Sequence, residues 1–132
     1  METYIGVAVG GAIGTVGRYW LSGVVAALIG ETFPWGTLVI NVTGSFVIGF
    51  FATLTGPDGR VFVGTTGRQF VMVGICGGYT TFSAFSLQTL NLMNDGEWFR
   101  GGAYIVLSVV LCLVAVWAGY ILAVSFNTMK WT

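Results

Sequence analysis

Histidine is absent from this sequence of 132 residues, lysine occurs once, and charged side chains make up only 8% of the chain. The five basic and five acidic residues cancel, so the chain offers no basic surface for nucleic acid or for anionic lipid. The single lysine and the lack of any Gly-x-Gly spacing exclude a Walker A phosphate loop and a dinucleotide fingerprint. Nucleic acids and nucleotides are therefore excluded as ligands.

Carboxylates are few, and all of them fall in predicted termini or loops. Because histidine is also missing, the interior lacks the usual general acids and bases, and we expect no enzymatic activity. The two cysteines, Cys76 and Cys112, lie on separate segments without Cys-x-x-Cys spacing, which argues against a zinc site or a redox pair. The carboxylates are Glu2, Glu31, Asp58, Asp95 and Glu97.

Apolar residues dominate the chain, at 55% of the sequence with a mean hydropathy of +0.87. A hydrocarbon core about 30 Å thick requires roughly 20 helical residues to cross it. The sequence therefore predicts a single all-α transmembrane domain over residues 1–132, with short polar or turn-forming connections. Its four predicted helices cover residues 4–29, 37–54, 70–93 and 103–126.

The third apolar segment contains a double glycine, Gly77 and Gly78, followed by two threonines, Thr80 and Thr81. This combination predicts a helix broken at its centre. Backbone groups released from a helix cannot face lipid, so the break has to lie within protein or line a path for ions or water. Carbonyls at the break could bind a hard cation such as sodium, although a glycine kink used only for tight packing is the alternative.

Uncharged polar side chains recur at helical spacing on three of the predicted helices. Each stripe alone is explained by hydrogen bonds between helices. Three stripes that converge on a broken helix favour a permeation path, because such groups can replace part of an ion's hydration shell. The stripes are Thr37, Asn41 and Ser45; Tyr104, Ser108 and Cys112; and Ser86 and Thr89 beside the rings of Phe82 and Phe85.

The first predicted helix carries one charge, Arg18, and four near-regular glycines. An arginine at this position either acts as a functional or structural anchor or reaches out to the membrane interface, and the sequence leaves both open. The glycines predict close packing against another backbone. They are Gly6, Gly10, Gly14 and Gly17.

The orientation signal is weak. An even number of crossings places Arg60, Arg68 and Lys130 on one side of the membrane and Arg100 on the other. With so small a bias, insertion both ways round is expected. Four helices of this size are poorly suited to enclosing a pore, so we expect an antiparallel homodimer.

The run Gly74–Ser86, with Gly-Gly-x-Thr-Thr-Phe-Ser-x-Phe-Ser at its centre, and the run Gly36–Asn41 resemble the Fluc (CrcB) fluoride channel family. The resemblance covers essentially the whole chain. It implies a dual-topology antiparallel homodimer in the cell's inner membrane, in contact with lipid, with two pores that pass fluoride passively out of the cell. It also implies a structural sodium ion at the centre of the dimer.

The resemblance also implies roles for individual residues. Backbone carbonyls of Gly77 and Thr80 would hold the sodium ion, and Arg18 would be an anchor. Cys112 stands where the family commonly has a serine, and Tyr79 is bulkier than the aliphatic residue expected there. The fluoride pore would be lined by Asn41, Phe82, Ser83, Phe85, Tyr104, Ser108 and Cys112.

Two other classes of protein fit four apolar helices. A proton-coupled exporter of the small multidrug resistance type needs a buried carboxylate, and the predicted helices contain none. A non-transporting membrane accessory protein would explain the glycines but would leave Asn41, Phe82 and Phe85 without a role.

Overall fold

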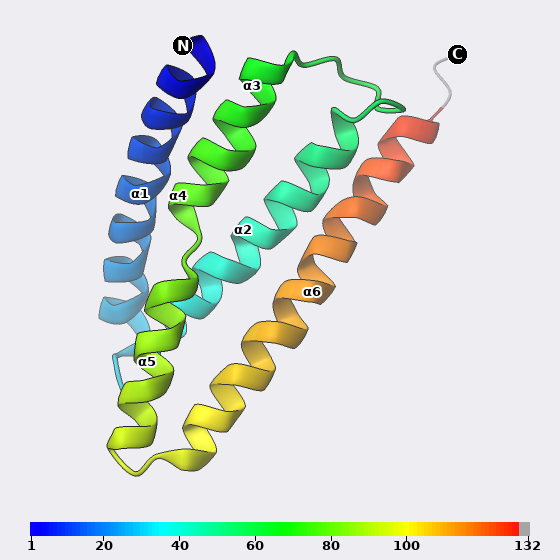
Figure 1. The fold of residues 1–132 in the computed structure, drawn as a ribbon. Helices are drawn as coiled ribbons and strands as arrows, with labels where there is room; N and C mark the ends of the chain where they lie inside the picture. The colour runs from blue at the N-terminus through cyan, green and yellow to red at the C-terminus, as the bar shows by residue number, and fades with distance from the viewer. Residues whose placement is uncertain (130–132) are drawn as a thin grey trace.

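The computed structural model describes residues 1–129, and these form helices joined by short connections (Figure 1). Four helical spans are long and apolar enough to cross a membrane, as the sequence predicted. The third span is made of four consecutive pieces. The elements are α1 (Glu2–Ile29), α2 (Trp35–Leu54), α3 (Thr65–Gln69), the π-helix η1 (Phe70–Cys76), α4 (Gly77–Tyr79), α5 (Phe82–Asn94) and α6 (Trp98–Thr128).

The spans run alternately up and down (Figure 1). The N-terminus and the α2–α3 connection, which carries Arg60, lie at one end of the molecule, and the α5–α6 connection lies at the other. Gly30 and Gly96, both with positive φ, end α1 and form the turn before α6. Lys130, which contributes to the predicted orientation signal, lies outside the described residues.

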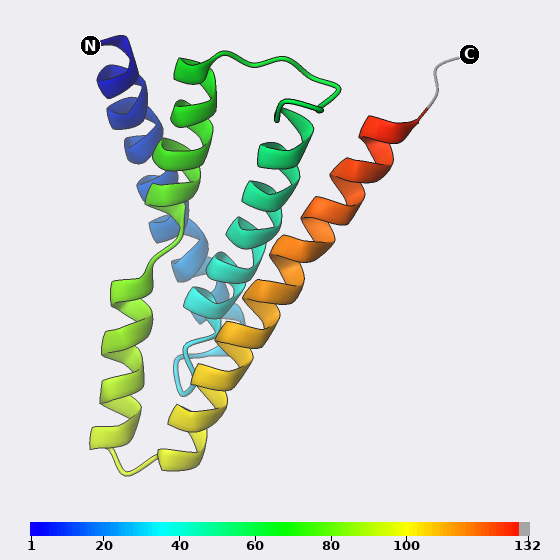
Figure 2. The same ribbon diagram turned by 45° about the vertical axis from the view of Figure 1, so that its right-hand side comes forward.

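The third span is interrupted at Thr80 and Thr81, which adopt extended conformations with φ/ψ of −84°/158° and −152°/118°. Figure 2 shows α5 displaced from the line of α4. The interruption therefore falls at the threonines, while Gly77 and Gly78 remain helical. Gly78 serves packing instead, because a Cβ there would come within 2.6 Å of the Gly11 carbonyl oxygen.

Glycines bring α1 against the third span, as the sequence predicted for this helix. A Cβ on Gly10 would lie 2.4 Å from the Phe70 carbonyl oxygen, and a Cβ on Gly14 would lie 2.1 Å from that of Ile75. Only glycine permits so close an approach of two backbones. Gly17 is different, because its Cβ would meet nothing within 4 Å.

The spans α2 and α6 pack on each other by the same means, through Gly49 and Gly119. A small core lies where α2, α5 and α6 meet, with Leu38, Leu92 and the fully buried Tyr104 at its centre. Arg68 secures one end by donating to the Thr55 carbonyl oxygen at 3.0 Å, next to the C-terminus of α2. The remaining apolar side chains are largely exposed, as expected for surfaces that face lipid.

Candidate functional site

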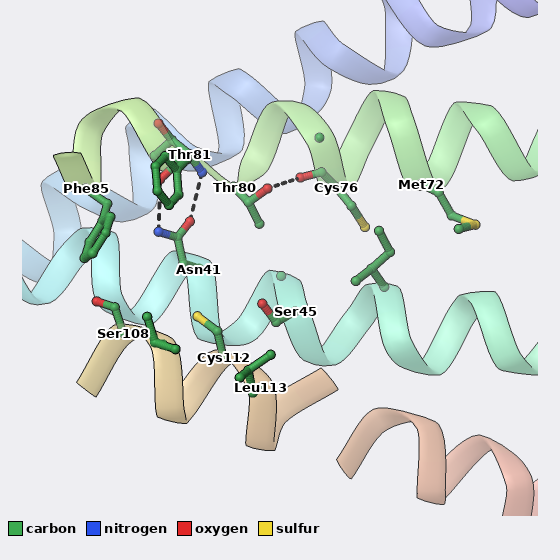
Figure 3. A pocket seen from close by; sticks show the side chains of 15 residues that line it. Asn41, Ser45, Met72, Cys76, Thr80, Thr81, Phe85, Ser108, Cys112 and Leu113 are labelled. Atoms are coloured by element: carbon green, nitrogen blue, oxygen red, sulfur yellow. Dashed lines mark hydrogen bonds between the residues drawn. The ribbon is translucent and has the colours of Figure 1, made fainter. Parts of the chain in front are cut away.

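A cavity of about 430 Å³ lies between α2, the third span and α6, next to the interruption (Figure 3). Its walls bring together polar residues of the α2 and α6 stripes with the two phenylalanine rings of the third. The hydroxyls predicted beside those rings, Ser86 and Thr89, do not line it and donate to the carbonyl oxygens one turn earlier on α5, at 3.0 and 2.8 Å. Gly77 and Thr80, the predicted cation ligands, also line it. The other predicted residues in its walls are Asn41, Ser45, Phe82, Phe85, Ser108 and Cys112.

Asn41 is hydrogen bonded to the interrupted backbone. Its Nδ2 donates to the Thr81 carbonyl oxygen at 3.0 Å, and its Oδ1 accepts from the Thr81 N–H at 2.8 Å (Figure 3). Thr81 Oγ1 accepts from the Ala84 N–H at 3.1 Å, so this threonine is also the N-cap of α5. Side chains thus replace part of the lost helical bonding.

Arg18 approaches the interruption from α1. Its Nε donates to the Gly78 carbonyl oxygen at 3.0 Å. In an unbroken helix that carbonyl would accept from the N–H of Phe82, four residues along. The guanidinium therefore contacts a backbone group released by the break and brings a formal positive charge close to it.

The carbonyls of Gly77 and Thr80 have lost their helical donors. In an α-helix they would accept from the N–H groups of Thr81 and Ala84, but these donate to Asn41 Oδ1 and Thr81 Oγ1. The space beside Gly77 is open, since a Cβ there would meet only the Met72 carbonyl oxygen at 3.8 Å. Two carbonyl oxygens without helical donors fit a hard cation such as sodium.

Two phenylalanine rings stand directly after the interruption. The centroids of Phe82 and Phe85 are 5.4 Å apart, with 55° between the ring planes, and both residues line the cavity. Phe82 is 79% exposed in a single chain, whereas Phe85 packs against Tyr104 with centroids 5.0 Å apart. The edges of such rings carry partial positive charge and can contact an anion.

Ser108 presents an unsatisfied hydroxyl group. The residue is 6% exposed and lines the cavity, and its Oγ has no hydrogen-bond partner among the described residues. Serines in helices commonly bond back to the carbonyl four residues earlier, and this one does not. A buried hydroxyl without a partner costs about 1–3 kcal/mol, which indicates that water or an ion is its partner.

Tyr104 and Ser83 lie outside this cavity. Tyr104 is fully buried and donates to Gln88 Oε1 at 2.8 Å, while Ser83 is exposed, with its Oγ 3.2 Å from Thr81 Oγ1. Gln88 also lines a second, more polar cavity of about 600 Å³, together with Thr37. Sequence reasoning missed Gln88. Its spacing could have found it, because a residue three positions after Phe85 lies on the same face of the helix.

Gly44 is a second residue that sequence reasoning missed. It lies on α2 and lines the cavity. A Cβ there would lie 2.3 Å from Thr80 Cγ2 and 3.1 Å from the Tyr79 ring. Gly44 therefore makes room for the interruption and for the bulky Tyr79, whose hydroxyl lies 2.7 Å from Thr43 Oγ1.

Four membrane-spanning helices, with a cavity at an interruption in the third, define a small multi-pass membrane protein. Residues 5–120 match the family described as CrcB-like protein, Camphor Resistance (CrcB). The protein belongs to the CrcB family, as its sequence motifs predicted.

Relatives named fluoride-specific ion channel FluC are similar to this protein over nearly their whole length. The relative from Opitutus terrae is 65% identical over 130 residues, which is 98% of each chain. The relative from Rhodospirillum rubrum is 63% identical over 125 residues, covering 95% of this chain and 97% of its own. The relative from Methylocella silvestris is 58% identical over 127 residues, covering 96% and 97%.

Proposed function

We propose that this protein is a fluoride-selective channel that lets fluoride leave the cell passively and so reduces its toxicity. The names of its relatives support this function. The observation that carries it is the cavity at the interruption, where the unpartnered Ser108 hydroxyl lies with the rings of Phe82 and Phe85. No carboxylate lines this cavity within residues 1–129, so none of its side chains carries a negative charge that would repel an anion.

Fluoride holds its water tightly, and a narrow path has to replace that water with closely spaced donors. Amide and hydroxyl hydrogens and ring edges stabilise an anion without a full positive charge, which would hold it too long for rapid passage. Cys112 continues the path beyond Ser108 with a weaker donor. We place Tyr104 and Ser83 at the edges of the path, next to Phe85 and Thr81.

The proposed assembly is an antiparallel, dual-topology homodimer with two pores in the inner membrane. Near the interruption of a single chain, Ser83, Thr43 and the backbone of Gly77 are exposed, and polar groups at membrane depth are costly to leave facing lipid. A second copy would cover them. We further propose that carbonyls of Gly77 and Thr80 hold a sodium ion, which supplies fixed positive charge.

Efflux from liposomes, followed with a fluoride electrode, tests this function. The protein should release fluoride rapidly without a proton gradient and release negligible chloride. Phe82→Ile should slow fluoride while the dimer persists, and Val110→Ile, on the exposed face of α6, is the matched control with unchanged flux. Flux that depends on a proton gradient would favour an exporter, and no flux at all would favour an accessory protein.

A further inference from the structure

Thr81 lies at the interruption of a membrane-spanning helix, where backbone groups without a hydrogen-bond partner are costly. Both backbone polar groups of Thr81 leave the helical ladder, and neither can find a partner in lipid. A single side chain provides both partners, because the Asn41 amide donates to the Thr81 carbonyl at 3.0 Å and accepts from the Thr81 N–H at 2.8 Å. This pair of bonds crosses from α2 to the start of α5.

An asparagine amide has two N–H hydrogens and one carbonyl oxygen. One hydrogen and the oxygen are engaged with Thr81, which leaves one hydrogen for the cavity that Asn41 lines. We propose that Asn41 is a positioning residue that fixes the interruption through the main chain of Thr81, which leaves at most one amide N–H for the anion contact of the proposed function. The second half of this proposal rests on the proposed function.

Because of where Thr81 lies, this pair of hydrogen bonds affects both the Phe82 ring and the Gly77 carbonyl. Thr81 caps α5 and is followed directly by Phe82, so its backbone sets where the first phenylalanine ring stands. Its N–H is also the donor that the Gly77 carbonyl would have in an unbroken helix. By holding that N–H, Asn41 leaves the Gly77 oxygen open at the proposed cation site. Asn41 thus links the phenylalanine pair to that site.

Two substitutions separate positioning from anion contact. Asn41→Leu is close in size and removes both bonds. Asn41→Asp keeps the shape, and in acidic buffer its protonated carboxyl offers one acceptor and one O–H donor, enough to bind Thr81 but with no second donor. In alkaline buffer the carboxylate can still accept from the Thr81 N–H, but it repels the Thr81 carbonyl oxygen and leaves it without a donor. Ser45→Ala, one turn further along α2 on the same cavity, is the matched control.

Hydrogen exchange of the Thr81–Phe85 amides in lipid nanodiscs is the first readout, compared with the unmodified protein at each pH. We expect Asn41→Leu to exchange at least about tenfold faster, since two hydrogen bonds are lost. In alkaline buffer Asn41→Asp should exchange faster than the unmodified protein but more slowly than Asn41→Leu, because it keeps one of the two hydrogen bonds, and it should regain protection in acidic buffer. Ser45→Ala should leave exchange unchanged. If Asn41→Leu does not fold, the response of Asn41→Asp to pH decides the matter.

Fluoride efflux is the second readout. In acidic buffer Asn41→Asp should keep the interruption protected and still conduct at least about tenfold more slowly than the unmodified protein, because the free donor is missing. The positioning role of Asn41 would be overturned if hydrogen exchange were unchanged in Asn41→Leu, or if exchange in Asn41→Asp did not depend on pH. Restored flux in acidic buffer would overturn the anion contact. A lack of fluoride flux in the unmodified protein would refute the proposed function and leave the exchange result standing.

Discussion

Substituting Gly14 by alanine tests whether close backbone contact holds α1 to the third span. The added Cβ would lie 2.1 Å from the Ile75 carbonyl oxygen, against 3.4 Å for ordinary contact, so α1 has to retreat by about 1.3 Å. A second backbone atom, the Tyr79 nitrogen at 2.8 Å, blocks sideways relief. Neither obstacle is a flexible side chain that could rotate away.

The cost follows from two opposing terms. Overpacking of this kind costs about 3 kcal/mol, and a gap of 0.5–1 Å forfeits roughly a quarter to a half of each van der Waals attraction along the contact. In the opposite direction, the higher helix propensity of alanine stabilises the helix by about 1 kcal/mol relative to glycine. We therefore expect Gly14→Ala to lower the free energy of unfolding by about 2 kcal/mol.

Gly17→Ala is the matched control on the same helix, because its Cβ would meet nothing within 4 Å. It should be neutral or stabilising by up to about 1 kcal/mol. Titration with a denaturing detergent in mixed micelles, followed by tryptophan fluorescence, measures both variants. If the two alanines prove equally stable, close packing of α1 on the third span is refuted.

Three further substitutions test other parts of the structure. Ser108→Ala should leave the detergent midpoint unchanged or raised, because its hydroxyl has no hydrogen-bond partner within residues 1–129, and should slow fluoride efflux several-fold. A fall in stability without a change in flux would contradict this. Arg68→Met removes donors at Thr55 and should lower the free energy of unfolding by about 1–3 kcal/mol in the same titration, while fluoride-over-chloride selectivity is retained. Gly44→Ala should displace Thr80, whose methyl lies 2.3 Å from the added Cβ, and slow efflux, whereas undisturbed flux would show that the interruption tolerates movement there.

Hydropathy was enough to predict the spans, because four apolar runs have few other stable structures in a membrane. Helical spacing was enough to gather Asn41, Ser108 and Cys112, which line one cavity. Spacing could not show that the third member of the α6 stripe, Tyr104, turns away from it. That outcome depends on a partner from another span, Gln88, and on packing against Phe85.

The sequence placed the break within residues 77–81, as the structure confirms, but not at the residues where it falls. Two glycines look like the weakest point of a helix, yet Gly77 and Gly78 stay helical while the threonines are extended. Propensity measured in water ignores what a membrane demands, which is a partner for each released group. Thr81 can supply one with its own hydroxyl, and glycine cannot.

The distribution of these partners limits what can occupy the site. Two donors at the break are engaged: the Thr81 N–H with Asn41 and the Ala84 N–H with Thr81 Oγ1. Gly78 receives the guanidinium of Arg18, so one released carbonyl already has a cationic partner. Gly77 and Thr80 keep carbonyls whose helical donors are bound elsewhere. An anion cannot satisfy a carbonyl oxygen, whereas a cation or water can. By binding the Thr81 N–H, Asn41 therefore leaves the Gly77 carbonyl oxygen in need of another partner, such as a cation or water.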